Sequence, residues 1–254
     1  MSDFILGAVA YDAKVVPIWE GFKLYFLARG LPFDFVLYST YERQVAAHLR
    51  GEIDVAWNSP LAWIHTQRAA PDRAKAIAMR DTDRDLSSVV LVRADGPIKS
   101  VADLRRVACG AADSPQATLI PMLALREAGS TAQAVHHDVL LGKHGDHIGG
   151  ERDAVKALLA GTVDAACVVD GNRLAFAREG LFGTNALRVL LQTGLYDHCN
   201  FTTLADSPAA SKFVELLLAM SYDDPAVRPL LDMEGLTKWL PGRTSGYALL
   251  ERAV

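Results

Sequence analysis

One short pattern occurs twice in the 254-residue sequence, and it constrains the fold more than any other feature. Residues 45–57 read as the end of a helix, a glycine and an apolar strand, and residues 155–167 repeat that order. The matched pairs include Gly51 with Gly161, Asp54 with Asp164 and Ala56 with Ala166. Any helix–glycine–strand unit of an α/β protein has this pattern. Two explanations therefore stay open, a common local motif or two similar α/β lobes that each contain the unit once.

Strand-like and helix-like segments alternate along the chain. FILGAVA (residues 4–10) reads as a buried strand, and Pro17 opens the following helix. That helix places Ile18, Phe22 and Phe26 on one face. FDFVLYS, YERQVAAHLRG and IDVAW continue as strand, helix and strand, which predicts a parallel α/β layer. VACG, SPQATLIPMLALREAG, ERDAVKALLAG and TVDAACVV repeat the theme before a mostly helical tail.

The composition is that of an ordinary globular protein, with 50% hydrophobic residues, 22% charged residues and a net charge of −4. No basic run indicates a nucleic-acid partner, and no apolar run is long enough to form a membrane segment. The start, MSDFILGAVAYD, has none of the features of a secretory leader. We therefore expect a cytoplasmic protein if Met1 is the natural start, and a periplasmic one if a leader was removed. The three widely spaced cysteines are expected to be reduced thiols.

Polar residues follow two of the predicted strands, where α/β sheets bind their ligands. One strand ends in Asn58 and Ser59, and another ends at Asp170. Ser59 and Ser114 each precede a proline, an arrangement typical of a helix N-cap. Such a helix start either needs the serine only as a cap, as expected for Ser207, or also binds an anionic oxygen through its N–H groups.

Several segments resemble one protein family. They are STYERQVAAHLRGEIDVAWNSPLAW, SSVVLVRADGPIKSVADLRRVACGAADSPQATLIPMLAL and ERDAVKALLAGTVDAACVVD. In this order they resemble the phosphate/phosphite/phosphonate-binding components of bacterial ABC transporters. The resemblance implies the type II periplasmic-binding-protein fold, in which two α/β lobes joined by two extended crossovers enclose a ligand cleft. The implied lobes are residues 1–84 plus 200–254 and residues 86–195, with crossovers near 82–89 and 190–203.

The resemblance also implies ligand contacts. It assigns Tyr41, Asn58 and Ser59 to the first lobe and a hydroxyl-rich, anion-binding turn to ADSPQAT in the second. Ser114 keeps one hydroxyl of that turn, whereas Gln116 stands where the family has another. A phosphonate-binding histidine of some members corresponds to Glu151, and a ligand-binding aspartate falls near Cys199. Phosphonate itself is therefore not the ligand that these positions favour.

The histidine-rich segment HHDVLLGKHGDHIGGERDAV has two possible roles. His144 and His147 have a spacing that metal ligands use, but no cysteine or carboxylate pattern completes a zinc site, so no metal site is predicted. A glycine-rich loop that enters a helix near Glu151 is favoured instead, with His147 and Glu151 as ligand contacts. In the later segment GLYDHCNF, neighbouring side chains of an extended chain point to opposite faces, so we expect no contact between His198 and Cys199.

The leading hypothesis is a protein that binds a small polar, anionic metabolite, with no catalytic residue and no cofactor. The carboxylates among the expected contacts suggest a ligand that also bears donors such as an amino group. An ABC-transporter permease is the expected partner if the protein is exported. The alternative is a cytosolic enzyme on the same fold, a lyase or synthase, with acid–base groups from His147, Cys199 and the carboxylates. The expected ligand contacts are Tyr11, Tyr41, Asn58, Ser59, Ser114, Gln116, His147, Glu151, Asp170 and Cys199.

Overall fold

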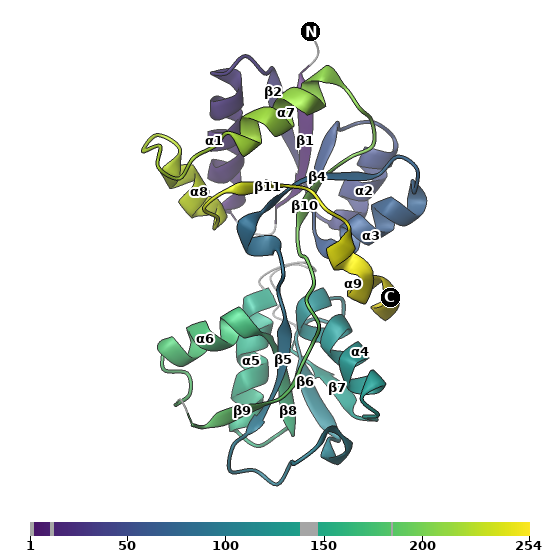
Figure 1. Cartoon of the computed structure of the whole chain (residues 1–254), viewed down its shortest axis with the longest axis vertical. Helices are drawn as coiled ribbons and strands as arrows, with labels where there is room; N and C mark the ends of the chain where they lie inside the picture. The colour runs from purple at the N-terminus through teal and green to yellow at the C-terminus, as the bar shows by residue number, and fades with distance from the viewer. Residues whose placement is uncertain (1–2, 11–12, 138–146, 184) are drawn as a thin grey trace. The chain divides into compact units, whose positions relative to one another are not determined.

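The chain forms two compact units in a computed structural model that describes residues 3–10, 13–137, 147–183 and 185–254 (Figure 1). The first unit comprises Met1–Arg84 and Asp197–Tyr247, and the second comprises Asp85–Tyr196 and Ala248–Val254. Tyr11, an expected ligand contact, lies outside the described residues. Among the described residues, no helix has both the length and the apolar character that crossing a membrane requires.

The first unit contains a six-stranded mixed sheet in the order β11-β4-β10-β3-β1-β2. Strands β1, β2 and β3 are parallel, whereas β10 runs antiparallel to both β3 and β4. Its strands are β1 (Phe4–Val9), β2 (Phe33–Tyr38), β3 (Val55–Asn58), β4 (Lys75–Arg80), β10 (Asn200–Thr203) and β11 (Trp239–Pro241). Its helices are α1 (Val15–Leu27), α2 (Tyr41–Leu49), α3 (Pro60–Ala69), α7 (Pro208–Leu218) and α8 (Arg228–Glu234), with 3₁₀ turns at Asp81–Asp83 and Ser245–Tyr247.

The second unit contains a five-stranded sheet in the order β7-β6-β8-β5-β9. Strands β6, β7 and β8 are parallel, and β5 runs antiparallel to β8 and β9. The strands are β5 (Ser88–Arg93), β6 (Arg106–Cys109), β7 (Gln133–His136), β8 (Ala165–Val169) and β9 (Leu187–Gln192). The helices are α4 (Ile120–Glu127), α5 (His147–Leu159), α6 (Asp170–Arg178) and α9 (Ala248–Ala253), with a π-helical turn at Pro115–Leu119 and a 3₁₀ turn at Val101–Asp103.

The C-terminal residues 248–254 group differently from the predicted division, which placed them in the first lobe. Their helix α9 packs against α4, and Arg252 pairs with Glu127 at 3.4 Å. Both elements belong to the second unit. The sequence of the tail contains no signal that distinguishes this partner from another helix.

The repeated pattern of the sequence corresponds to the same structure in both units. Helix α2 leads into β3 and helix α5 leads into β8, and each turn uses a glycine at positive φ, 76° at Gly51 and 70° at Gly161. Asp54 accepts a hydrogen bond from the main-chain N–H of Ile5 at 2.7 Å, and Asp164 accepts the equivalent bond from Arg106 at 2.8 Å. Each aspartate thereby ties its turn to the start of the neighbouring strand. The explanation by two similar α/β lobes is confirmed.

The segments predicted as crossovers lie side by side. Leu86 and Tyr196 exchange two main-chain hydrogen bonds of 2.8 Å within the second unit. The main-chain N–H of His198 donates to the carbonyl of Asp83 at 2.8 Å within the first. This pairing satisfies main-chain polar groups of both segments, so both are fixed where they leave their sheets.

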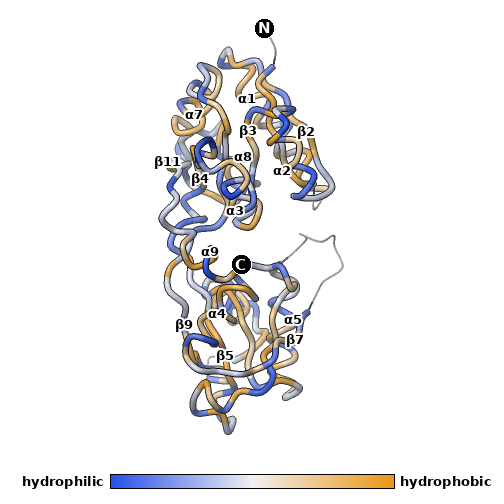
Figure 2. Tube along the Cα trace, turned by 90° about the vertical axis from the view of Figure 1, so that its right-hand side faces the viewer, coloured by the Kyte–Doolittle hydropathy of each residue, from blue (hydrophilic) through white to orange (hydrophobic). Residues whose placement is uncertain are grey.

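Both sheets bury residues on two faces. Val89 and Leu91 of β5 pack with α5 and α6, whereas the alternate residues Val90 and Val92 pack with α4. A strand covered on both faces reads as a continuous apolar run, which explains the sequence SVVLVR. In the first unit α1 and α7 cover one face of the sheet, and α2 and α3 lie on the other (Figure 1). Hydrophobic segments, coloured orange, recur through the described trace of each unit (Figure 2).

The predicted buried face of α1 is confirmed. Ile18, Phe22 and Phe26 are at most 4% exposed. The ring centroid of Phe26 lies 4.7 Å from that of Phe33 in β2 and 5.0 Å from that of Phe213 in α7. Aromatic contacts of this kind contribute about 0.5–1.5 kcal/mol each beyond the burial of their area. They join α1, α7 and β2 into one core.

We expect the buried His48 to make stability depend on pH. Burial lowers its pKa to about 4, with Arg73 acting in the same direction and the main chain of Asp54 against it. The unfolded chain, with a pKa near 6.5, binds the proton first, so stability is full above pH 6.5 and falls as the pH drops toward 4. The free energy of unfolding, measured with urea, should be about 2–3 kcal/mol lower at pH 4.5 than at pH 7, and His48→Leu should remove this difference. If His48→Leu lost as much stability between pH 7 and pH 4.5 as the parent does, this expectation would be contradicted. The control is His65→Gln, which changes an exposed histidine.

Candidate functional site

Two helices of the first unit begin at the carboxyl edge of its parallel strands. Helix α2 follows β2, and the Thr40 hydroxyl accepts the Arg43 N–H at 3.3 Å. Helix α3 follows β3, and the Ser59 hydroxyl accepts the Ala62 N–H at 3.2 Å. Tyr41, the first residue of α2, is half-buried. This edge therefore presents the positive ends of two helix dipoles.

The second unit has the same arrangement at its carboxyl edge. Strand β6 ends at Cys109, and the following turn leads to Ser114, which is fully buried and accepts the Ala117 N–H through its hydroxyl at 3.2 Å. Strand β8 ends at Val169, where α6 begins. The cap at Ser114 matches two caps of the first unit. Among the described residues, helix starts capped by a Ser-Pro pair occur at Ser59, Ser114 and Ser207.

The helix after Ser114 does not begin as the regular α-helix that the sequence predicted. Pro121 has no N–H to donate to the carbonyl of Ala117, four residues earlier. That carbonyl instead accepts the Gly110 N–H at 3.2 Å, and the first turn widens to a π-helix, in which the Leu119 N–H reaches the Ser114 carbonyl at 2.9 Å. The Gly110 bond pins the start of the helix to the end of β6. Single π turns of this kind are frequent at functional sites.

Asn58 and Gln116, both expected as ligand contacts, are buried. The Asn58 amide accepts from Gln44 at 2.9 Å and donates to Thr202 at 2.9 Å, so it joins α2, β3 and β10. Gln116 is 5% exposed, and its main-chain carbonyl accepts the Ser88 hydroxyl at 2.6 Å. Its side-chain oxygen has no hydrogen-bond partner among the described residues. Asn58 is therefore part of the scaffold, and Gln116 offers an acceptor.

Two expected carboxylates meet at the start of α6. Glu151 is fully buried, and its Oε2 accepts from the main chain of Val169 and from the side chain of Asn172, each at 2.9 Å. Asp170 pairs with Arg173 at 2.6 Å. The helix α5 begins at His147, whose side chain lies outside what the structure describes. Asp170 thus has a cationic partner, whereas Glu151 accepts hydrogen bonds from two neutral donors.

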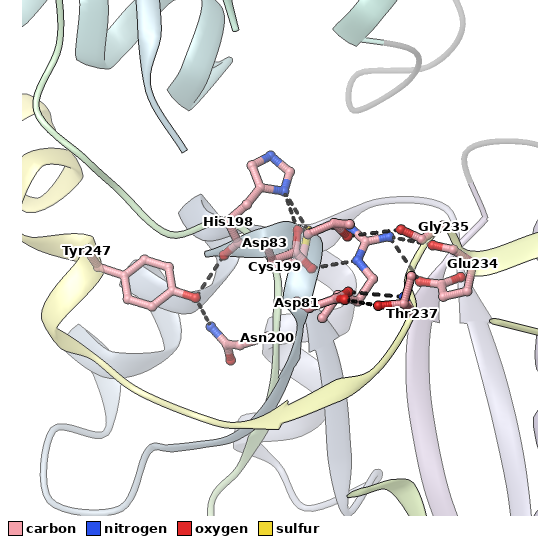
Figure 3. A network of polar contacts seen from close by, with 11 residues as sticks. Asp81, Asp83, His198, Cys199, Asn200, Glu234, Gly235, Thr237 and Tyr247 are labelled. Carbon is pink, nitrogen blue, oxygen red and sulfur yellow. Dashed lines mark hydrogen bonds and ion pairs between the residues drawn. The ribbon is translucent and has the colours of Figure 1, made fainter. Parts of the chain in front are cut away.

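The predicted separation of His198 and Cys199 is wrong. His198 Nδ1 lies 3.1 Å from Cys199 Sγ and 3.3 Å from Asp83 Oδ1 (Figure 3). Strand β10 begins only at Asn200, so the alternation of side chains along a strand does not apply to these two residues. Because β10 starts beside the end of β3, the cluster lies at the carboxyl edge of the first unit's sheet.

A half-buried arginine holds the carboxylate of this cluster in place. Arg80 contacts both carboxylate oxygens of Asp83, at 2.5 and 2.9 Å, and lies 3.2 Å from Glu234. Burial opposes charge on His198, but attraction to Cys199 and the contact with Asp83 outweigh it and raise the pKa of the imidazole to about 10. Burial likewise raises the pKa of Glu234 to about 7, against the pull of Arg80. Arg80, Asp83 and Glu234 were not expected from the sequence. Only the pairing of β4 with β11 brings Glu234 to Arg80, and only the fold brings Asp83 to His198.

A family comparison decides what kind of protein carries this geometry. Residues 15–247 match the profile of the family described as periplasmic phosphonate substrate-binding proteins of ABC transporters. The chain belongs to this family. Its members bind small molecules and work with permease components. A comparison with curated proteins finds no match.

Solved structures show the same fold at low sequence identity. PhnD1 from Prochlorococcus marinus, in complex with methylphosphonate, is 16% identical with a TM-score of 0.71, and the match covers 98% of this chain and 96% of that one. XAC2383 from Xanthomonas citri, bound to ATP, is 17% identical with a TM-score of 0.74, covering 100% and 96%. The periplasmic aliphatic sulphonate binding protein SsuA from Escherichia coli is 19% identical with a TM-score of 0.58, covering 99% and 85%. The type II periplasmic-binding-protein fold is thereby confirmed.

We expect Glu151 to stabilise the protein even without a ligand. Glu151→Gln weakens a buried, charge-assisted pair of hydrogen bonds and should lower the free energy of unfolding by about 1–3 kcal/mol in urea titrations. The control Glu215→Gln removes only an exposed pair with Lys212 and should cost less than about 1 kcal/mol. Unchanged stability of Glu151→Gln, with weaker ligand binding, would assign Glu151 to the ligand instead.

Proposed function

We propose that this chain is a substrate-binding protein that holds a small oxyanion at a helix N-terminus on the carboxyl edge of the second unit's parallel strands. The observation that carries the proposal is the turn from Gly110 to Ala117, where a buried Ser-Pro helix start is fixed to the end of β6. Main-chain N–H groups at such a start bind anions without any charged side chain. The family assignment supports the same kind of ligand.

Two of the carboxylates near these helix starts do not oppose an anion. Asp170 and Asp83 each pair with an arginine of their own unit, which offsets the negative charge locally. A ligand with an amino group was expected from the sequence, which shows the carboxylates but not the arginines that pair with them. With their charges offset, a tetrahedral oxyanion without an amino group also suits the site.

Phosphonates and sulfonates are the proposed ligand class. The solved structures with this fold include one in complex with methylphosphonate and one of an aliphatic sulphonate binding protein. In this chain Gln116 and Pro115 follow Ser114 where the resemblance implied further hydroxyls. Those positions counted against a phosphonate bound through the family's hydroxyl groups, but main-chain N–H groups at the same turn can supply donors to the oxygens of a sulfonate or a phosphonate. We propose that the protein works in the periplasm and delivers this ligand to a permease.

The enzyme alternative gains no support from these comparisons. A thiol nucleophile needs a histidine whose second ring nitrogen is oriented by a third group. Here Asp83 and Cys199 both contact the same atom, His198 Nδ1, so the three residues do not form such a relay.

Calorimetry tests the proposal and the role of Ser114 together. Methylphosphonate or methanesulfonate should bind with one-to-one stoichiometry, whereas acetate at the same concentration should give no heat. Ser114→Ala should weaken this binding by about 1–3 kcal/mol if its hydroxyl meets a charged oxygen. Absence of binding by every tetrahedral anion would overturn the proposed function.

A matched variant separates ligand binding from capping. Ser207 caps α7 in the same way, at 3.0 Å from the Ala210 N–H, but it lies in the first unit, at the amino edge of that unit's parallel strands. Ser114→Ala and Ser207→Ala should each lose about 1 kcal/mol of stability, and only Ser114→Ala should lose affinity. Equal affinity in the two variants would show that Ser114 only caps its helix.

A further inference from the structure

We propose that Asp83, His198 and Cys199 form a binding site for one transition-metal ion of the zinc class. One ligand atom from each residue lies within 4.8 Å of the other two. Among the described residues this is the one group of three or more histidine, cysteine and acidic side chains with that property. All three residues belong to the first unit, and two of them are buried.

The spacing of these atoms suits tetrahedral coordination. In a zinc site with ordinary bond lengths, neighbouring ligand atoms lie roughly 3.3–3.6 Å apart. Here His198 Nδ1 is 3.3 Å from Asp83 Oδ1 and 3.1 Å from Cys199 Sγ. The sulfur and the carboxylate oxygen thus converge on one ring nitrogen, where a metal ion would replace a single shared proton.

The surroundings hold the three groups in place before any ion binds. Both carboxylate oxygens of Asp83 contact Arg80, and the main chain of His198 is fixed from two sides. Its N–H donates to the Asp83 carbonyl and its carbonyl accepts from the Tyr247 hydroxyl, each at 2.8 Å (Figure 3). Outer contacts of this kind orient metal ligands and raise metal affinity.

The donor atoms decide which ion fits. A thiolate, an imidazole and one carboxylate favour zinc and similar ions over magnesium or calcium, which take oxygen ligands. Arg80 works against a cation, but the carboxylate of Asp83 and the thiolate of Cys199 offset the charge of a dication, and Glu234 lies beside Arg80. Three protein ligands leave a fourth position open, and His198, 21% exposed at its side chain, lies on the accessible side.

Titration of the metal-free full-length chain with Zn²⁺ and with Co²⁺ tests the site. We expect one ion per chain and, for Co²⁺, a sulfur-to-metal charge-transfer band that only thiolate coordination produces. The titration contains no phosphonate or sulfonate, so its outcome does not depend on the proposed function. Absence of binding, or Co²⁺ binding without that band, would overturn the site, because metal held by histidines elsewhere gives no such band.

Ligand variants and matched controls complete the test. Cys199→Ser and His198→Gln should each weaken Zn²⁺ binding at least tenfold, whereas Cys167→Ala and His65→Gln should bind as the parent does. Because substitutions in a buried cluster can affect folding, thermal melting of each variant is recorded with and without Zn²⁺. We expect Zn²⁺ to raise the melting temperature of the parent and the controls but not of the two ligand variants. Parent-like Zn²⁺ binding in Cys199→Ser would contradict the site.

Discussion

A chain of buried, uncharged hydrogen bonds fixes the carboxyl edge of the first unit. It runs from Gln44 to Asn58, Thr202, Asn200 and Tyr247. Each buried partner left unsatisfied would cost about 1–3 kcal/mol, so the chain enforces the register of β3 against β10. The proposed metal site depends on this register. It sets where α3 begins, and the Tyr247 hydroxyl continues the chain to the main chain of His198, beside the proposed metal ligands.

Most of the fold could be predicted from the sequence because it follows from local patterns that recur along the chain. The glycines at positions 51 and 161 mark helix ends that only a left-handed residue makes easily. The run SVVLVR is apolar throughout because β5 is covered on both faces. The helix caps at Ser59, Ser114 and Ser207 could also be predicted from the sequence, because each serine accepts from an N–H only three residues away.

The site was less predictable because its contacts are not local. Asp83 lies in a charged stretch typical of a solvated turn, and only the fold brings it to His198. The contact between His198 and Cys199 depended on where β10 begins, and a strand boundary is the least certain feature of a sequence pattern. The π turn after Ser114 could not be predicted, because it depends on a non-local contact. Pro121 leaves the carbonyl of Ala117 without its helical partner, and only the fold brings the N–H of Gly110 close enough to bond it.

Binding of an anion by main-chain N–H groups is the central claim, and amide NMR tests it most directly. In a two-dimensional ¹⁵N–¹H spectrum, methylphosphonate or methanesulfonate should shift the amide resonances of the turn from Gly110 to Ala117 in a saturable way. The amides at the start of α7 provide the internal reference, because that helix has the same Ser-Pro cap but begins at the amino edge of the first unit's parallel strands. The account predicts large shifts in the first set and none in the second. Saturable shifts that leave residues 110–117 unaffected would contradict it.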